Sequence, residues 1–184
     1  NFAFAETLMN QLGRSGTVYM WATHENSILK QIRAQMDGRY KNTQLSDWLD
    51  LITDGRLVDM NDLTLRHYFH PVMKGRTSIK KVLDAVWQVN EDLRKRYPEY
   101  VKIEDGKLLS PHKSLPPLEI NGQDAFVNEG TGAITAYQAM LYGPQKSDTL
   151  IRDQWRQLLL EYCKLDTLAM VLIYWHWQES LQTP

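Results

Sequence analysis

Hydrophobic residues recur at helical spacing in the first third of the chain. Apolar positions three and four residues apart predict helices over Phe2–Leu12, His24–Met36 and Gln44–Ile52. Two short apolar runs beside glycine, Thr17–Ala22 and Arg56–Met60, have the β-branched and aromatic character of buried strands. The pattern therefore predicts the order helix, strand, helix, helix, strand.

The rest of the chain has mostly helical spacing. We predict helices over 61–69, from Thr77 or Ser78 onward, over 130–142, and over 148–162 and 166–178, the last two either joined or separate. Two strands do not form a stable sheet by themselves. We therefore expect either further strands that the pattern does not reveal or pairing with strands outside this chain.

Turn signals concentrate between Tyr100 and Asn128. The segment holds Asp105-Gly106, Ser110-Pro111, Pro116-Pro117 and Asn121-Gly122. We interpret 100–128 as a loop insertion within a single domain that covers residues 1–184.

The composition is that of a globular protein. Of the 184 residues, 43% are hydrophobic and 23% are charged, which excludes a disordered or collagen-like chain. The single cysteine, Cys163, excludes an internal disulfide and suits a reducing cytoplasm. The apolar stretch Leu165–Trp177 is too short and too polar to cross a membrane, so we expect no membrane partner. Because the chain begins at Asn1 rather than Met, we expect a fragment or a mature product.

Charge is distributed unevenly. The segment 65–102 holds nine Lys and Arg against four Asp and Glu, a net of +5, and the remaining residues carry −6. Either this segment is a solvated helix face or it contacts a polyanion.

A tyrosine and an aspartate lie four residues apart near the C-terminus. On a helix, Tyr162 and Asp166 would project from the same face into a common site. Asp166 stands in an apolar stretch, where a carboxylate needs a partner or a metal ion. The alternative is that Asp166 caps the last helix.

Further polar residues follow the two predicted strands. Glu25, after the first strand, is either a site residue at the strand's exit or an acid that suits the helix dipole. Asp59 is either a ligand or the cap of the helix that follows. His67 and His70 form a weak metal-binding signal because no third ligand accompanies them.

Several kinds of catalytic site are disfavoured. The chain has no G-x-S-x-G motif, and Gly130-Thr131-Gly132 is not a complete phosphate loop. Cys163 has apolar neighbours, which favours a structural thiol over a nucleophile.

Four strings, taken together, resemble a bacterial family of unknown function. They are GTVYMWATHENSIL (16–29), LVDMNDL (57–63), FHPVMKGRTSIKKVLDAVW (69–87) and LLLEYCKLDTLAMVLI (158–173), of which SIKKVL and YCKLDTLAM are the most specific. That family resembles DnaQ-like exonucleases of the DEDD type. The resemblance implies an α/β, RNase H-like fold, mostly helical in this segment, with its N-terminal strands missing.

The resemblance also implies a two-metal site. Asp166 matches the fourth acid of the DEDD set, Tyr162 matches the tyrosine of one subclass, and Glu25 approximates the third acid. Asp59 resembles an acid often found on the next strand. Carboxylate ligands suit Mg²⁺ or Mn²⁺. The chain departs from the pattern because no D-x-E precedes Glu25, and we expect that motif upstream of Asn1.

The function implied is metal-dependent hydrolysis of phosphodiester bonds in DNA or RNA. Lys74, Lys80 and Lys81 would then contact phosphates of the nucleic acid. Two alternatives remain open: a catalytically inactive nucleic-acid-binding module, and a protein-interaction module with Trp155, Trp175 and Trp177 on its surface. Those tryptophans would otherwise belong to the core.

Overall fold

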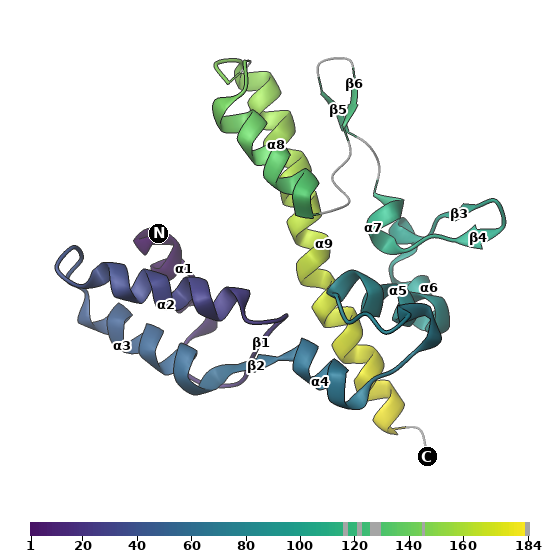
Figure 1. Ribbon diagram of the computed structural model, residues 1–184, viewed down its shortest axis with the longest axis horizontal. Helices are drawn as coiled ribbons and strands as arrows, with labels where there is room; N and C mark the ends of the chain where they lie inside the picture. Colours follow the sequence, from purple (N-terminus) through teal and green to yellow (C-terminus); the bar gives the residue numbers. More distant parts are fainter. Residues whose placement is uncertain (116–117, 121–122, 126–129, 145, 183–184) are drawn as a thin grey trace. The chain divides into compact units, whose positions relative to one another are not determined.

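The computed structural model describes residues 1–115, 118–120, 123–125, 130–144 and 146–182 (Figure 1). The chain divides into two compact units, Asn1–Phe69 and His70–Pro184. Helices dominate, and a few short strands accompany them, so the protein belongs to the α/β class. That the two units form a single domain stays a prediction.

The first unit alternates helices with two short strands. Its elements are α1 (Phe2–Leu12), β1 (Val18–Met20), α2 (His24–Met36), α3 (Thr43–Leu51), a π-helical turn (Ile52–Arg56), β2 (Leu57–Asp59) and α4 (Met60–His67). The predicted bounds of α1 and α2 are confirmed at both ends. The strands are shorter than predicted, because hydrogen-bonded pairing covers three residues of each.

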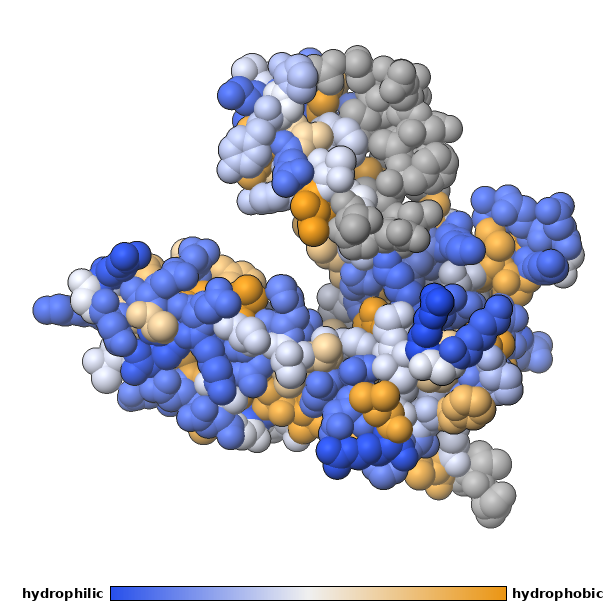
Figure 2. Space-filling model, in the orientation of Figure 1, coloured by the Kyte–Doolittle hydropathy of each residue, from blue (hydrophilic) through white to orange (hydrophobic). Residues whose placement is uncertain are grey.

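The two strands pair in parallel, so their carboxyl ends share an edge. Val18 pairs with Leu57, and Met20 pairs with Asp59. Helices α1, α2 and α3 enclose a core whose buried members are Ala5, Leu29, Ile32, Met36, Leu45, Trp48, Leu49 and Ile52. Hydrophilic side chains cover most of the α2–α3 face that Figure 2 shows, as expected for amphipathic helices.

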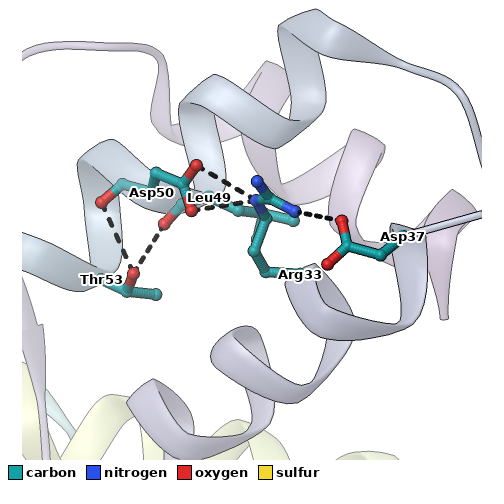
Figure 3. Close-up of polar contacts among 5 residues, drawn as sticks. All are labelled: Arg33, Asp37, Leu49, Asp50 and Thr53. Carbon is teal, nitrogen blue, oxygen red and sulfur yellow. Dashed lines mark hydrogen bonds and ion pairs between the residues drawn. The ribbon is translucent and has the colours of Figure 1, made fainter.

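Arg33 joins α2 to α3 on the surface of this unit (Figure 3). Its Nε lies 2.9 Å from Asp50 Oδ1, and its Nη1 lies 3.0 Å from Asp37 Oδ1. The Asp50 carboxylate and, to a smaller extent, the Asp37 carboxylate raise the pKa of the Arg33 guanidinium. Thr53 Oγ1 donates to the Leu49 carbonyl at 2.9 Å and so stabilises the turn that follows α3.

The second unit is built on a long helix. Its elements are two short 3-10 turns (Pro71–Met73 and Pro98–Tyr100), α5 (Ile79–Val89), α6 (Glu91–Arg96), β3 (Ile103–Glu104), β4 (Lys107–Leu108), α7 (Pro111–Ser114), β5 (Leu118–Ile120), β6 (Gln123–Ala125), α8 (Gly130–Tyr142) and α9 (Thr149–Gln182). The predicted helices 148–162 and 166–178 are one continuous helix, α9, and α8 is confirmed at both ends.

The segment 100–128 contains short elements as well as turns. Strands β3 and β4 form one antiparallel hairpin, and β5 and β6 form another. The turn signals Pro116-Pro117 and Asn121-Gly122 lie outside the described residues. That this segment is an insertion stays a prediction.

Helix α9 packs against α5, α8 and the short helix α7. Helix α5 packs on it, and α8 packs on its N-terminal part, where Ala136, Ile151, Leu158 and Tyr162 form a buried cluster. The other buried side chains of α5 and α9 are Val82, Leu83, Ala85, Val86, Trp87, Leu165, Ala169, Leu172 and Ile173. Within the ranges given above, none of the helices combines the length and the apolar character that a membrane span needs.

Candidate active site on the long C-terminal helix

Tyr162 and Asp166 lie one turn apart on α9. Tyr162 is 7% exposed, whereas the Asp166 side chain is 34% exposed. The alternative that Asp166 caps a helix is wrong, because α9 runs without a break from Thr149 to Gln182. Asp166 therefore needs another reason to stand between the buried Leu165 and the partly buried Leu168.

A buried histidine supplies the partner of that carboxylate. His112, in α7, is 3% exposed, and its Nε2 lies 2.8 Å from Asp166 Oδ1. Its ring meets the Tyr162 ring edge to face, with centroids 6.3 Å apart and planes 63° apart. Sequence reasoning missed His112, since nothing in the turn-rich segment around it marks a functional residue.

Lys80 contacts the same tyrosine from α5. Its Nζ lies 4.9 Å from the centroid of the Tyr162 ring, which is within cation–π range. Lys80, His112, Tyr162 and Asp166 thus form one group, which we call the Tyr162 cluster. It joins three elements of the second unit and places an ammonium, an imidazole, a phenol and a carboxylate together.

Lys80 and Lys81 occupy the first turn of α5. Cations at a helix N-terminus oppose the helix dipole, which favours anions there. Lys74 precedes them in a left-handed conformation with φ of 51°, and its side chain is exposed. A bound phosphate would relieve the repulsion between these charges and the dipole.

Glu25 and Asp59 lie in the first unit: Asp59 is the last residue of β2, and Glu25 lies in the first turn of α2, after β1. Asp59 Oδ1 accepts from the Ala22 N–H at 2.9 Å and from the Asn61 N–H at 2.8 Å. Asp59 is therefore the N-cap of α4, as its capping interpretation predicts. Glu25 is exposed in the first turn of α2, where the dipole favours an acid.

The acids of either unit do not complete a metal site. Across the part of the chain that the structure describes, no group of three His, Cys, Asp or Glu side chains could hold a metal ion. The second unit offers Asp166, with His112 beside it, and the first offers Glu25 and Asp59. That Glu25, Asp59 and Asp166 bind metal ions stays a prediction.

His70 and Trp175, two further residues that the sequence singled out, make local structural contacts. His70 Nδ1 accepts from the Val72 N–H at 3.3 Å and caps the turn Pro71–Met73. Trp175 is partly buried and stacks on Tyr97, with ring centroids 6.4 Å apart.

Cys163 is exposed on α9, next to Tyr162. Although its side chain is exposed, desolvation by neighbouring groups and, to a smaller extent, the Asp166 carboxylate raise the pKa of its thiol. A raised pKa lowers the thiolate fraction and disfavours a nucleophilic role.

Residues 1–78 match the model of a family described as a domain of unknown function (DUF2779). The match includes β1, β2 and α1 to α4 and ends at Ser78, before the Tyr162 cluster. No curated protein and no solved structure matches the chain.

Proposed function

We propose that this protein is a metal-dependent nuclease, or the C-terminal part of one, that hydrolyses phosphodiester bonds of DNA or RNA. The observation that carries the proposal is the Tyr162 cluster. A partly exposed carboxylate, a phenol and a lysine ammonium meet there, and each suits one task in phosphodiester hydrolysis.

Lys80, Tyr162 and Asp166 of the cluster each have a role in this proposal. The ammonium of Lys80 neutralises charge on a substrate phosphate, and the phenol of Tyr162 orients that phosphate or the attacking water. Asp166 provides a hard oxygen ligand of the kind that Mg²⁺ or Mn²⁺ takes. The metal, when bound, supplies an activated water and stabilises the leaving oxygen.

The first unit supports the RNase H-like, DEDD-type part of the proposal. Positions at or just after the carboxyl ends of parallel strands are favoured for sites in α/β folds. Glu25 and Asp59 have such positions, and we propose both as metal ligands. The proposal includes a cytoplasmic location, on the ground of the single cysteine.

A second candidate function is nucleic-acid binding without hydrolysis. The observation that favours it is the cationic start of α5, since Lys74, Lys80 and Lys81 could bind phosphates without any metal. A protein of this kind would bind single-stranded nucleic acid in a salt-dependent manner and leave it intact.

The test is a cleavage assay with the natural full-length protein. End-labelled single-stranded DNA and RNA are incubated with Mn²⁺, with Mg²⁺, and with EDTA, and the products are separated on a sequencing gel. We expect cleavage of at least one substrate with either metal and none with EDTA. Intact substrates under all conditions, with retained binding, would favour the second candidate function.

The ligand assignments need separate variants. We expect Glu25→Gln, Asp59→Asn and Asp166→Asn to raise the Mn²⁺ concentration needed for half-maximal cleavage. Lys80→Gln should raise KM, whereas Lys146→Gln, an exposed lysine outside the cluster, should leave it unchanged. An unchanged Mn²⁺ requirement in any of the three acidic variants would remove that residue from the ligand set.

A further inference from the structure

We propose that His112 is a positioning residue that orients the Asp166 carboxylate. The inference rests on the proposed function, because it assigns His112 a task in the same site. It starts from the 2.8 Å contact between His112 Nε2 and Asp166 Oδ1, which links α7 to the middle of α9.

The hydrogen-bond partners of the two ring nitrogens indicate which nitrogen of His112 carries the proton. His112 Nδ1 is buried and has no hydrogen-bond partner among the described residues. A buried N–H without an acceptor costs free energy, so the proton belongs on Nε2, where it donates to the carboxylate. A proton on Nε2 is therefore the arrangement that fits the contacts of this ring.

Because the His112 ring is buried, we assign it a positioning role and not a catalytic one. His112 is 3% exposed, and Nε2 is already engaged by Asp166. Neither nitrogen faces solvent, so the imidazole does not itself accept a proton from a substrate water. The imidazole instead holds one oxygen of the Asp166 carboxylate, whose side chain is 34% exposed. The other oxygen is left for a cation or a water.

The surroundings keep the ring in place. Pro111, the preceding residue, is buried, and helix α7 packs against both α5 and α9. The imidazole also makes an edge-to-face contact with the Tyr162 ring. Histidine–carboxylate pairs of this kind around metal sites fix the direction of the ligand, and their loss usually lowers activity or metal affinity.

Two substitutions separate the hydrogen bond from the packing. His112→Gln places an amide N–H near the position of Nε2, whereas His112→Leu fills the space without a donor. With the full-length protein and labelled single-stranded DNA, we expect His112→Leu to lower kcat about 10- to 100-fold and to raise the Mn²⁺ requirement. We expect His112→Gln to restore most of the activity, and KM for DNA to change little in either variant.

The contrary outcomes are distinct. Full activity in His112→Leu would overturn the inference. Equal losses in both variants, together with equal losses of thermal stability, would assign His112 a purely structural role and overturn it too. Neither result would affect the proposed function, which depends on cleavage by the wild type.

A second readout does not need catalysis. Long-range ¹H–¹⁵N NMR spectra of the histidine rings report which nitrogen carries the proton. We expect the Nε2–H tautomer for His112 in the wild type and a changed signature in Asp166→Ala. An Nδ1–H tautomer would contradict the inference even in an active enzyme. An inactive wild type with the expected tautomer would instead locate the failure in the proposed function.

Discussion

Asp59 holds the backbone of Ala22. The Asp59 Oδ1 accepts the Ala22 N–H at 2.9 Å, and Ala22 has the left-handed φ of 62° that residues with a Cβ seldom adopt. The same oxygen accepts from Asn61 at the start of α4. A single carboxylate oxygen thus joins the exit from β1 to the helix after β2.

Removing that carboxylate should destabilise the first unit. We predict that Asp59→Ala lowers the free energy of unfolding by about 1–3 kcal/mol, because it removes a helix cap and leaves the Ala22 N–H without its acceptor. Asp59→Asn keeps an oxygen in the same position and should cost less. Urea denaturation followed by circular dichroism measures both, and equal stability of Asp59→Ala and the wild type would refute the role.

Arg56 connects the end of α1 to the start of β2. Its guanidinium donates to the carbonyls of Gly13 at 2.8 Å and Gly16 at 2.9 Å, and also to those of Leu12 and Ser15. Trp48 Nε1 shares the Gly13 carbonyl at 2.7 Å. The sequence around Arg56 gives no sign of this, because the acceptors lie about 40 residues earlier.

Arg56 is difficult to replace because its guanidinium presents several N–H donors in a fixed geometry. We predict a loss of about 1–3 kcal/mol for Arg56→Ala, and an intermediate loss for Arg56→Lys, whose ammonium has fewer N–H donors than the guanidinium and cannot serve all four carbonyls. Thermal melts of the two variants and the wild type test the order. If Arg56→Lys proved as stable as the wild type, charge alone would account for the contribution of Arg56.

Two leucines of α9 provide a matched test of packing. Leu165 is fully buried, whereas Leu160 is 52% exposed. Leu165→Ala should cost about 2–5 kcal/mol because it leaves a cavity at a fully buried position. Leu160→Ala should change stability by less than about 0.5 kcal/mol. Chemical denaturation measures both, and similar losses in the two variants would contradict the burial of Leu165.

Cys163 should react slowly with alkylating agents. Because desolvation by neighbouring groups and the Asp166 carboxylate raise the pKa of its thiol, less thiolate is present at a given pH than for a free cysteine. We predict that iodoacetamide modifies Cys163 more slowly than glutathione at pH 8, and that Asp166→Asn accelerates the reaction. Mass spectrometry follows the time course. Modification faster than that of glutathione would show a depressed pKa instead.

Local pattern identifies most helices of this protein and little of its candidate site. The bounds of α1, α2 and α8 follow from apolar spacing and flanking glycines. The continuity of α9 does not, because Asp166 resembles a cap when only its neighbours are considered. Its partner His112 lies 54 residues away in the sequence, and no local rule connects the two.

For Glu25 and Asp59 of the first unit, too, the sequence predicts local roles but not tertiary contacts. The helix-dipole position of Glu25 and the capping role of Asp59 follow from their neighbours in the chain. That Asp59 also binds the Ala22 N–H depends on the parallel register of β1 and β2, which the sequence does not encode locally. Tertiary contacts therefore decide which of the candidate residues are partnered.

The most direct test of the account is the single-turnover cleavage rate of Asp166→Asn. We predict that this variant cleaves labelled single-stranded nucleic acid more than about 100-fold more slowly than the wild type with saturating Mn²⁺, beyond the loss typical of residues that only support a metal ligand. Asp153→Asn, an exposed acid on the same helix, should match the wild type. Equal rates for Asp166→Asn and the wild type would contradict the claim that the Tyr162 cluster is the catalytic site.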